Sequence, residues 1–170
     1  YMHEVAGRVG YLLTEVFAWY CPEVDEIKDE LMPLARQFGL ALQTVNVVRG
    51  IKKDYERGWV FIPVSFYQAH GLTRESFFDP ANMNKALGVV RHVTEKAENH
   101  LLSGLRYITL LPRQQYKIRL FCVWPLLFAV KTLALSRSNP DVLRAEAKIT
   151  RKQVKGIVAV SRLISWSNTL

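Results

Sequence analysis

The chain has 170 residues, 49% of them hydrophobic, and a formal net charge of +8 at pH 7. This length and composition predict a single domain, residues 1–170, with a substantial core. Its most apolar segment, 120–130, is shorter than the ~20 residues that a membrane span needs, and two lone cysteines, Cys21 and Cys122, exclude a disulfide framework.

Apolar residues recur at helical spacing through most of the chain and alternating strand patterns are missing, so we expect an all-α fold. A first helix is expected from about 1 to 19, and its early start indicates a fragment that begins inside a helix. A second, long helix is expected from about 24 to 57, with Pro33 as the place for a kink. Gly58 ends it, and 59–63 is expected to be an extended crossing segment.

Short helical turns are expected next, followed by a third long helix from about 82 to 111. A fourth helix, from about 114 to 136, contains Pro125 and should bend there. Residues 138–140 are expected to form a loop, and Thr150 is a suitable N-cap for the last helix. No repeat, low-complexity tract or linker divides the chain.

The second helix carries a polar stripe. Asn46, Gly50 and Asp54 are four residues apart, so they stack on one helical face, which Gln43 and Arg57 extend. The opposite face is apolar and suits a core: Phe38, Ala41, Leu42, Val45 and Val48. The polar stripe must therefore face water or a cavity.

Residues 43–63 resemble the second aspartate-rich motif of the squalene and phytoene synthase family, in which one Asn and two Asp residues help to hold magnesium against a diphosphate. Asn46 and Asp54 match that pattern, whereas Gly50 replaces the leading Asp and Lys53 stands where an acid is common. The resemblance implies Mg²⁺ as a cofactor, with Asn46 and Asp54 as its ligands. Lys53 could contact phosphate directly. The implied substrate-binding residues are Gln43, Asn46, Arg49 and Lys53.

Residues 1–10 resemble a stretch of squalene synthases in which small side chains make room for a prenyl chain. Here the small residues are Ala6, Gly7 and Gly10, and a glycine inside a helix costs about 1 kcal/mol relative to alanine. Close helix–helix packing is the alternative explanation for them. The same resemblance makes Tyr1 a catalytic candidate, since the family's tyrosine serves the first half-reaction.

Residues 120–125 look like the Phe-Cys-x-x-Pro segment that lines the isoprenoid cavity in this family. An aromatic residue in an apolar helix is usually part of a core. However, an aromatic face stabilises a desolvated cation by about 2 kcal/mol. The resemblance therefore makes Phe121 a catalytic candidate that stabilises an allylic carbocation.

Residues 147–154 are similar to a basic stretch of squalene synthases that is associated with the nicotinamide cofactor. Arg151, Lys152 and Lys155 gather near the start of the last helix, where positive charge is unfavourable unless an anion binds. A solvated basic surface is the alternative for each of these residues alone. The resemblance implies NADPH as a cofactor, with Lys148 and Arg151 as ligands of its phosphates.

The four resemblances follow the family's order and extend from about 1 to 157. They imply an isoprenoid synthase-type helical bundle, as the C-terminal portion of a protein whose N-terminal helices carry the first aspartate-rich motif. The implied activity is head-to-head condensation of two farnesyl diphosphates through presqualene diphosphate, with NADPH-dependent reduction to squalene. A related enzyme that stops before reduction, and a helical protein that binds isoprenoid without turnover, are the alternatives. We expect one cavity to be lined by Tyr1, Gln43, Asn46, Asp54 and Phe121.

The positive charge alone does not identify a partner. No nucleic-acid-binding motif is present and the basic residues are spread along the chain, so nucleic acid is not expected. Farnesyl diphosphate, a phosphorylated cofactor and an anionic membrane surface account for the charge equally well. The four histidines lack the spacing of a zinc site, and the cysteines suit a reducing cytoplasm, where we expect the protein, free or at a membrane surface.

Overall fold

The computed structural model describes residues 1–137 and 139–164. Every regular element within them is helical, so the all-α fold is confirmed. The α-helices are α1 (Arg8–Tyr20), α2 (Pro22–Asp25), α3 (Lys28–Glu56), α4 (Val64–Gln68), α5 (Met83–Leu110), α6 (Tyr116–Ser136) and α7 (Arg151–Ile164). The shorter turns are a π-helical turn, η1 (His3–Gly7), and three 3₁₀ turns, η2 (Ser76–Phe78), η3 (Pro80–Asn82) and η4 (Pro140–Leu143).

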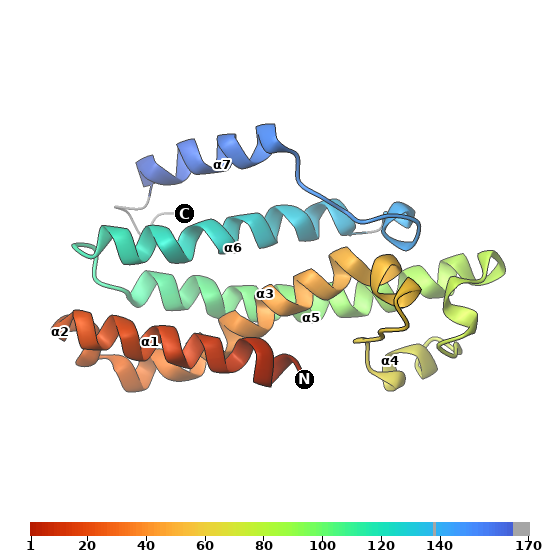
Figure 1. The fold of residues 1–170 in the computed structure, drawn as a ribbon, viewed down its shortest axis with the longest axis horizontal. Helices are drawn as coiled ribbons and strands as arrows, with labels where there is room; N and C mark the ends of the chain where they lie inside the picture. Colours follow the sequence, from red (N-terminus) through yellow and green to blue (C-terminus); the bar gives the residue numbers. More distant parts are fainter. Residues whose placement is uncertain (138, 165–170) are drawn as a thin grey trace.

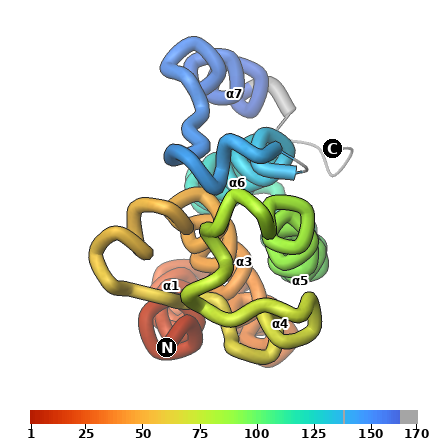
Figure 2. The backbone as a smooth tube through the Cα atoms, turned by 90° about the vertical axis from the view of Figure 1, so that its right-hand side faces the viewer, coloured from red at the N-terminus to blue at the C-terminus, as the bar shows by residue number. Residues whose placement is uncertain are grey.

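Helix α3 lies at the centre of the arrangement (Figure 1). It packs against α5, α1 and α6, and α6 also contacts α5. α7 lies outermost, beside α6, as Figure 1 and Figure 2 both show. The chain between α3 and α5 forms α4, η2 and η3, which pack near the start of α5. Because α3 is surrounded by other elements, one of its faces packs in the core and its other faces border any cavity inside the bundle.

The long helix expected from 24 to 57 is interrupted, so that prediction is wrong at its start. α3 begins only at Lys28, because the chain turns at Ile27, whose φ and ψ angles are −110° and 11°. Val24 before the turn and Leu31 after it both belong to the core, where each is 0% exposed. The turn leads into α3, which runs back along α1 and packs against it, so tertiary packing overrides the local helix preference here (Figure 1). After the turn, α3 continues through its internal proline.

The other predicted boundaries lie close to the observed ones. α5 and α6 each begin and end within two residues of the predicted ends. Residues 59–63 are not helical, in agreement with the extended crossing segment. Thr150 caps α7 as predicted, because its hydroxyl accepts a hydrogen bond from the Gln153 backbone N–H at 3.2 Å. In return, the Gln153 side chain accepts one from the Thr150 N–H at 2.8 Å, which forms a capping box.

Helix α6 is long and apolar enough to cross a membrane, by length and composition alone. In this fold it lies against α3, α5 and α7 and supplies part of the core. Arg119, near its start, is 1% exposed and donates hydrogen bonds to the carbonyl oxygens of Ile108 and Leu111 at 3.0 and 2.7 Å. These bonds satisfy carbonyl groups at the C-terminal end of α5. The buried apolar residues of α6 include Cys122, Val123, Leu126 and Leu133.

The segment between α6 and α7 folds back onto α3. Of the predicted loop at 138–140, Ser138 lies outside the described residues, and Pro140 already begins η4. Asn139 caps this turn by accepting a hydrogen bond from the Asp141 backbone N–H at 2.9 Å. η4 packs against α3. The residues between η4 and α7 are consequently held beside the second half of α3.

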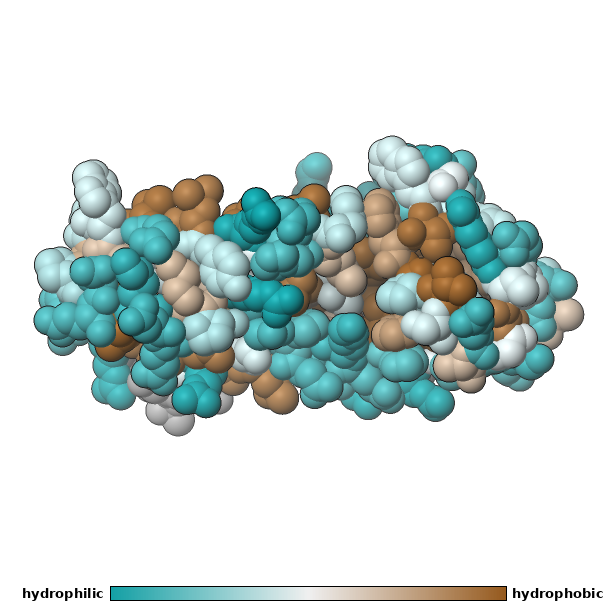
Figure 3. Space-filling model, turned by 90° about the horizontal axis from the view of Figure 1, so that it is seen from below, coloured by the Kyte–Doolittle hydropathy of each residue, from teal (hydrophilic) through white to brown (hydrophobic). Residues whose placement is uncertain are grey.

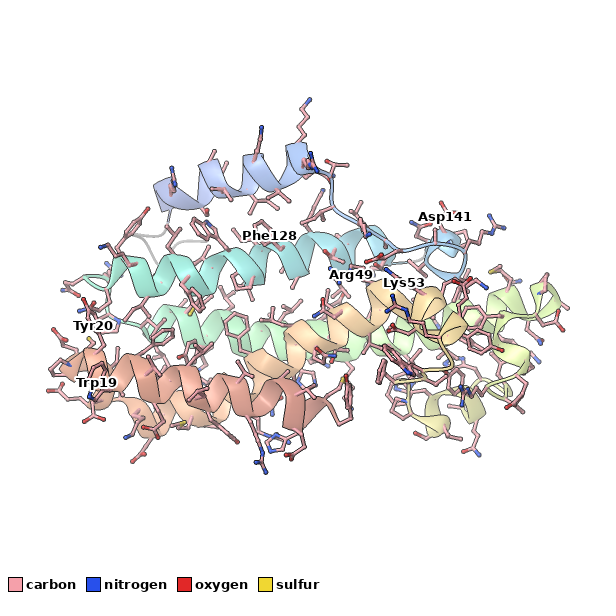
Figure 4. All side chains as sticks on the ribbon, viewed as in Figure 1. Trp19, Tyr20, Arg49, Lys53, Phe128 and Asp141 are labelled. Atoms are coloured by element: carbon pink, nitrogen blue, oxygen red, sulfur yellow. The ribbon has the colours of Figure 1, made fainter. Side chains whose placement is uncertain are left out.

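Helices α1 and α3 cross with their backbones in direct contact. A side-chain carbon added at Gly10 would overlap the backbone carbonyl of Ala35, and one added at Gly39 would overlap that of Ala6. The close packing that the sequence left as an alternative for the small residues is therefore present. Apolar side chains also reach the surface, as Figure 3 shows for one face, and Trp19 at the end of α1 is 88% exposed (Figure 4).

Candidate functional site

The polar stripe of α3 faces a pocket. The pocket has a volume of about 250 Å³ and lies between the second half of α3, the extended segment that follows it and the segment that precedes α7. Figure 4 shows Arg49 and Lys53 on α3 near the segment that carries Asp141. The polar residues that line the pocket are Gln43, Asn46, Arg49, Lys53, Asp54, Arg57 and Glu146.

Glu146 is the residue of this polar pocket that the sequence analysis did not identify. Its carboxylate lies 3.3 Å from Arg49 Nε, 3.9 Å from Lys53 Nζ and 2.8 Å from Lys148 Nζ. The hydrogen bond from Lys148, with the charges of Arg49 and Lys53 nearby, lowers the pKa of this carboxyl. The side chain is only 19% exposed. One sequence signal was available, because Glu146 is the single acid in the basic stretch 144–155.

Asp54 is the acid of the α3 stripe, and its carboxylate forms no ion pair with any described residue. An ideal Cβ at Gly50 would lie 3.2 Å from Asp54 Oδ2, so the missing side chain leaves space beside that carboxylate. Within residues 1–137 and 139–164, no three His, Cys, Asp or Glu side chains form a metal-binding group. The Asn46 amide and the Asp54 carboxylate suit a Mg²⁺ ion that takes its other ligands from water and substrate phosphates.

An apolar cavity of about 300 Å³ adjoins the polar pocket. Gln43 and Asn46 line both spaces, so the two meet along α3. The volume is at the lower end of the ~300–1,000 Å³ that is usual for ligand pockets. Ala6 and Gly10 also line the cavity, which gives the small residues a second role besides packing. Its larger apolar lining residues are Val5, Val9, Leu13, Phe17, Phe38, Leu42 and Phe121.

The walls of the apolar cavity carry few reactive groups. The Tyr107 hydroxyl is hydrogen-bonded to Thr14 Oγ1 at 2.9 Å, and burial raises its pKa. Burial also raises the pKa of the Cys122 thiol to about 12, so it stays protonated at neutral pH and is a poor nucleophile. Phe121 meets Phe17 edge to face, with ring centroids 6.0 Å apart. The cavity therefore offers aromatic rings and alkyl groups to its contents.

The structure distributes the five residues that were expected to share one cavity. Gln43 and Asn46 line both spaces, Asp54 lines the polar pocket and Phe121 lines the apolar cavity. Tyr1 lines neither, so the expectation of a single cavity is wrong for this residue. Its ring, 65% exposed, instead stacks on Phe61 with centroids 4.7 Å apart, because the two apolar faces bury one another. Phe61 itself lines the polar pocket.

The two residues expected at the cofactor phosphates lie on either side of the α7 N-cap. Lys148 pairs with Glu146 and so lies beside the polar pocket, whereas Arg151 is the exposed first residue of α7. A third cavity, of about 310 Å³, lies between α3, α6 and the start of the α7 segment. Its lining includes Asn46, Arg49 and Ile149, so it shares residues with the polar pocket.

Residues 1–153 match the family model described as squalene/phytoene synthase. Squalene synthase of Schizosaccharomyces pombe is 31% identical over 158 residues, which cover 93% of this chain and 34% of that protein. Squalene synthase of Rattus norvegicus is 30% identical over 153 residues, which cover 90% of this chain and 36% of that protein. Lycopaoctaene synthase of Botryococcus braunii is 31% identical over 173 residues, which cover 99% of this chain and 38% of that protein.

Two solved structures share the fold. The complex of TcSQS with the ligand BPH1237 superposes with a TM-score of 0.89 at 27% identity and covers 98% of this chain and 49% of that chain. The complex of TcSQS with the ligand E5700 gives a TM-score of 0.82 at 25% identity, with 98% and 48% covered. The chain thus spans about a third of the length of the curated relatives that it matches, and about half of the solved chains.

Proposed function

The chain belongs to the squalene/phytoene synthase family, and on that premise we propose that it takes part in joining two farnesyl diphosphates head to head, followed by NADPH-dependent reduction to squalene. The observation that carries this proposal is the junction of two spaces. A basic pocket that suits a diphosphate meets, at Gln43 and Asn46, an apolar cavity that suits a prenyl chain. A substrate with one charged end and one hydrocarbon end requires a basic pocket and an apolar cavity that adjoin in this way.

The polar pocket binds the diphosphate. Arg49, Lys53 and Arg57 bring positive charge to one side of α3, and charge-assisted hydrogen bonds to phosphate oxygens are strong. Asn46 and Asp54 would hold Mg²⁺, which supplies further positive charge against the diphosphate. As the allylic C–O bond breaks, the basic side chains stabilise the negative charge that develops on the departing diphosphate. Gln43, at the junction, orients the substrate between the two spaces.

The apolar cavity holds prenyl chains and keeps water from the carbocation. Phe121 lines this space but is 52% exposed, and an aromatic ring stabilises a cation by about 0.5–1 kcal/mol at an exposed site and by about 2 kcal/mol once water is excluded. The protonated Cys122 thiol and the hydrogen-bonded Tyr107 hydroxyl do not compete for the cation as nucleophiles. Tyr1 acts in the first half-reaction from the edge of the polar pocket, where its ring rests on Phe61.

Lys148 and Arg151 bind the phosphates of NADPH, and the third cavity, next to Ile149, provides space for the cofactor near Asn46. We also place the protein in the cytoplasm at a membrane surface, which the apolar product and the positive charge favour. One observation favours a second candidate, an enzyme that stops before reduction. Lys148 pairs with Glu146 at 2.8 Å, which holds it beside the polar pocket and leaves Arg151 as the remaining cofactor candidate.

The test is product analysis of the full-length protein with farnesyl diphosphate and Mg²⁺, with and without NADPH. We expect squalene only when NADPH is present. Dehydrosqualene or presqualene diphosphate under both conditions would establish the second candidate. Absence of any product from folded protein would contradict both enzymatic functions and leave isoprenoid binding without turnover.

Replacement of Lys148 and Arg151 together by Ala is expected to lower squalene formation at least about tenfold, because two phosphate contacts are lost. Formation of presqualene diphosphate should fall by a smaller factor, because Arg49 and Lys53 remain in the polar pocket when Lys148 is lost. The two rates are measured separately, by omitting and adding NADPH. Lys85→Ala removes an exposed lysine from the start of α5 and serves as the control. An equal loss of both half-reactions would assign Lys148 and Arg151 a structural role.

The combined change Gly50→Asp and Lys53→Glu is expected to lower the Mg²⁺ concentration for half-maximal activity about fivefold, because carboxylates are the ligands that Mg²⁺ prefers. An ideal Cβ at position 50 lies 3.2 Å from Asp54 Oδ2, so the Asp54 side chain shifts by a few tenths of an ångström, and the two carboxylates then lie side by side for one ion. Gly50→Asp alone should have little effect, since the new acid pairs with Lys53 one turn away. Lys52→Glu is the control, because Lys52 pairs with Glu56 and not with the polar pocket. An unchanged magnesium titration in an active double variant would exclude this face as the metal site.

A further inference from the structure

Glu146 has surroundings that neither the family motif nor the proposed function explains. Three basic side chains, from Arg49, Lys53 and Lys148, lie within 4.0 Å of its carboxylate. No other described carboxylate has three such partners. The carboxylate therefore lies where the basic residues of α3 converge, which is the place that a phosphate group would need.

The charges of the polar pocket show what Glu146 does there. Arg49, Lys53 and Arg57 line the pocket, and only Asp54 and Glu146 oppose them with negative charge. With Glu146 removed, Arg49, Lys53 and Lys148 lose their common ion-pair partner, and like charges crowd the site. The lowered pKa of Glu146 agrees with a carboxylate that stays ionised among these cations. Glu146 thus neutralises a site whose excess positive charge otherwise calls for an anion.

The ion pairs of Glu146 are not needed to hold its segment in place. On one side, Val142 and Leu143 of η4 are 0% and 5% exposed and belong to the core beside α3. On the other side, Ala147 packs against the same core, and Ile149 faces the third cavity. Apolar contacts therefore anchor the backbone before and after Glu146. Its side chain can rotate out of the pocket while the segment stays where it is.

We propose that Glu146 is an internal counterion, which takes the place of a phosphate group between Arg49, Lys53 and Lys148 and is displaced when a diphosphate binds. This inference rests on the proposed function, because it assigns the polar pocket to a diphosphate. When an anion displaces Glu146, the Glu146 carboxylate loses its three basic partners. Only an anion of high charge interacts with these cations strongly enough to offset that free-energy cost. The counterion consequently disfavours inorganic phosphate relative to diphosphate. Its return also assists release of the diphosphate after the C–O bond breaks.

The test is calorimetric titration of the full-length protein with inorganic diphosphate and with inorganic phosphate, without Mg²⁺. Glu146→Gln keeps the side-chain shape and removes the competing charge, so it should bind diphosphate about tenfold more tightly. It should also discriminate less between diphosphate and phosphate. Glu146→Asp keeps the charge and should retain the parent's affinity. Asp141→Asn is the matched control, because this exposed acid on η4 pairs with Arg144 outside the polar pocket (Figure 4).

Unchanged or weaker diphosphate binding by Glu146→Gln would overturn the inference, since Glu146 would then orient the cations and not compete for them. Thermal unfolding of each variant separates this result from a loss of fold. A failure of the proposed function is detected in a different experiment, the product analysis, as the absence of any product from farnesyl diphosphate. A parent that makes no product, but whose Glu146→Gln variant binds diphosphate more tightly, would still support the counterion.

Discussion

Asp54→Asn is expected to lower the rate of diphosphate release from farnesyl diphosphate about 100-fold, and to raise the Mg²⁺ concentration needed for half-maximal activity. Removal of one preorganised electrostatic group from a catalytic site costs ~10²–10³ in rate. Asp54 is the acid of the α3 stripe and has no ion-pair partner among the described residues, so its charge is available to a metal. Asn keeps the shape and one oxygen ligand but lacks the charge that attracts a divalent cation.

Single-turnover rates of presqualene diphosphate formation across a magnesium titration measure this effect. Glu56→Gln is the matched control, since Glu56 lies on the same helix, pairs with Lys52 and is exposed outside the polar pocket. We expect the control to stay within about twofold of the parent, as surface ion pairs contribute little. An Asp54→Asn variant with parental rate and parental magnesium dependence would mean that Arg49, Lys53 and Arg57 neutralise the diphosphate without a metal at this acid.

The polar stripe of α3 was predictable because it depends on local geometry alone. Asn46, Gly50 and Asp54 share a face in any α-helix, whatever packs around it. Glu146 was not predictable in the same way, since its contacts with Arg49 and Lys53 require η4 to fold back onto α3. No periodicity in the sequence encodes that return. The α3 stripe thus depends on local helix geometry and the position of Glu146 on tertiary contacts, so only the stripe could be inferred from the sequence.

The same distinction explains the other errors of the sequence analysis. The turn at Ile27 leads into α3, which packs back along α1, and helix preference contains no information about that packing. The position of Tyr1 depends on Phe61, which is 60 residues away in sequence, and so the stacking partner could not be inferred from residues 1–10. Each of these features is decided by side chains that are distant in sequence. Helix spacing cannot encode such contacts.

The small residues of the first helix illustrate a choice that the sequence left open. Room for a prenyl chain and close helix packing were alternatives. Ala6 and Gly10 both line the apolar cavity and lie at the close contact with α3, whereas Gly7 faces the His3 side chain and does not line that cavity. Gly10 allows backbone contact between α1 and α3, Gly39 allows it between α3 and η1, and both glycines line the apolar cavity. The shape of that cavity therefore depends on how closely the two helices approach. A methyl group at their contact should alter stability and cavity together.

Gly10→Ala is accordingly expected to lower the free energy of unfolding by about 3 kcal/mol, at the upper end for overpacking, because the new Cβ overlaps the Ala35 carbonyl and backbone must move. Thermal or denaturant unfolding of the full-length protein measures the change. Gly156→Ala on α7 is the matched control, since nothing lies within 4 Å of its Cβ position and helix preference favours Ala by about 1 kcal/mol. Because α1 and α3 cross closely at Gly10, whereas nothing packs on Gly156, we expect the free energy of unfolding to fall in the first variant and to rise in the second. Equal stabilisation by both would mean that α1 does not contact α3 at Gly10, and that the apolar cavity is wider than its glycine walls imply.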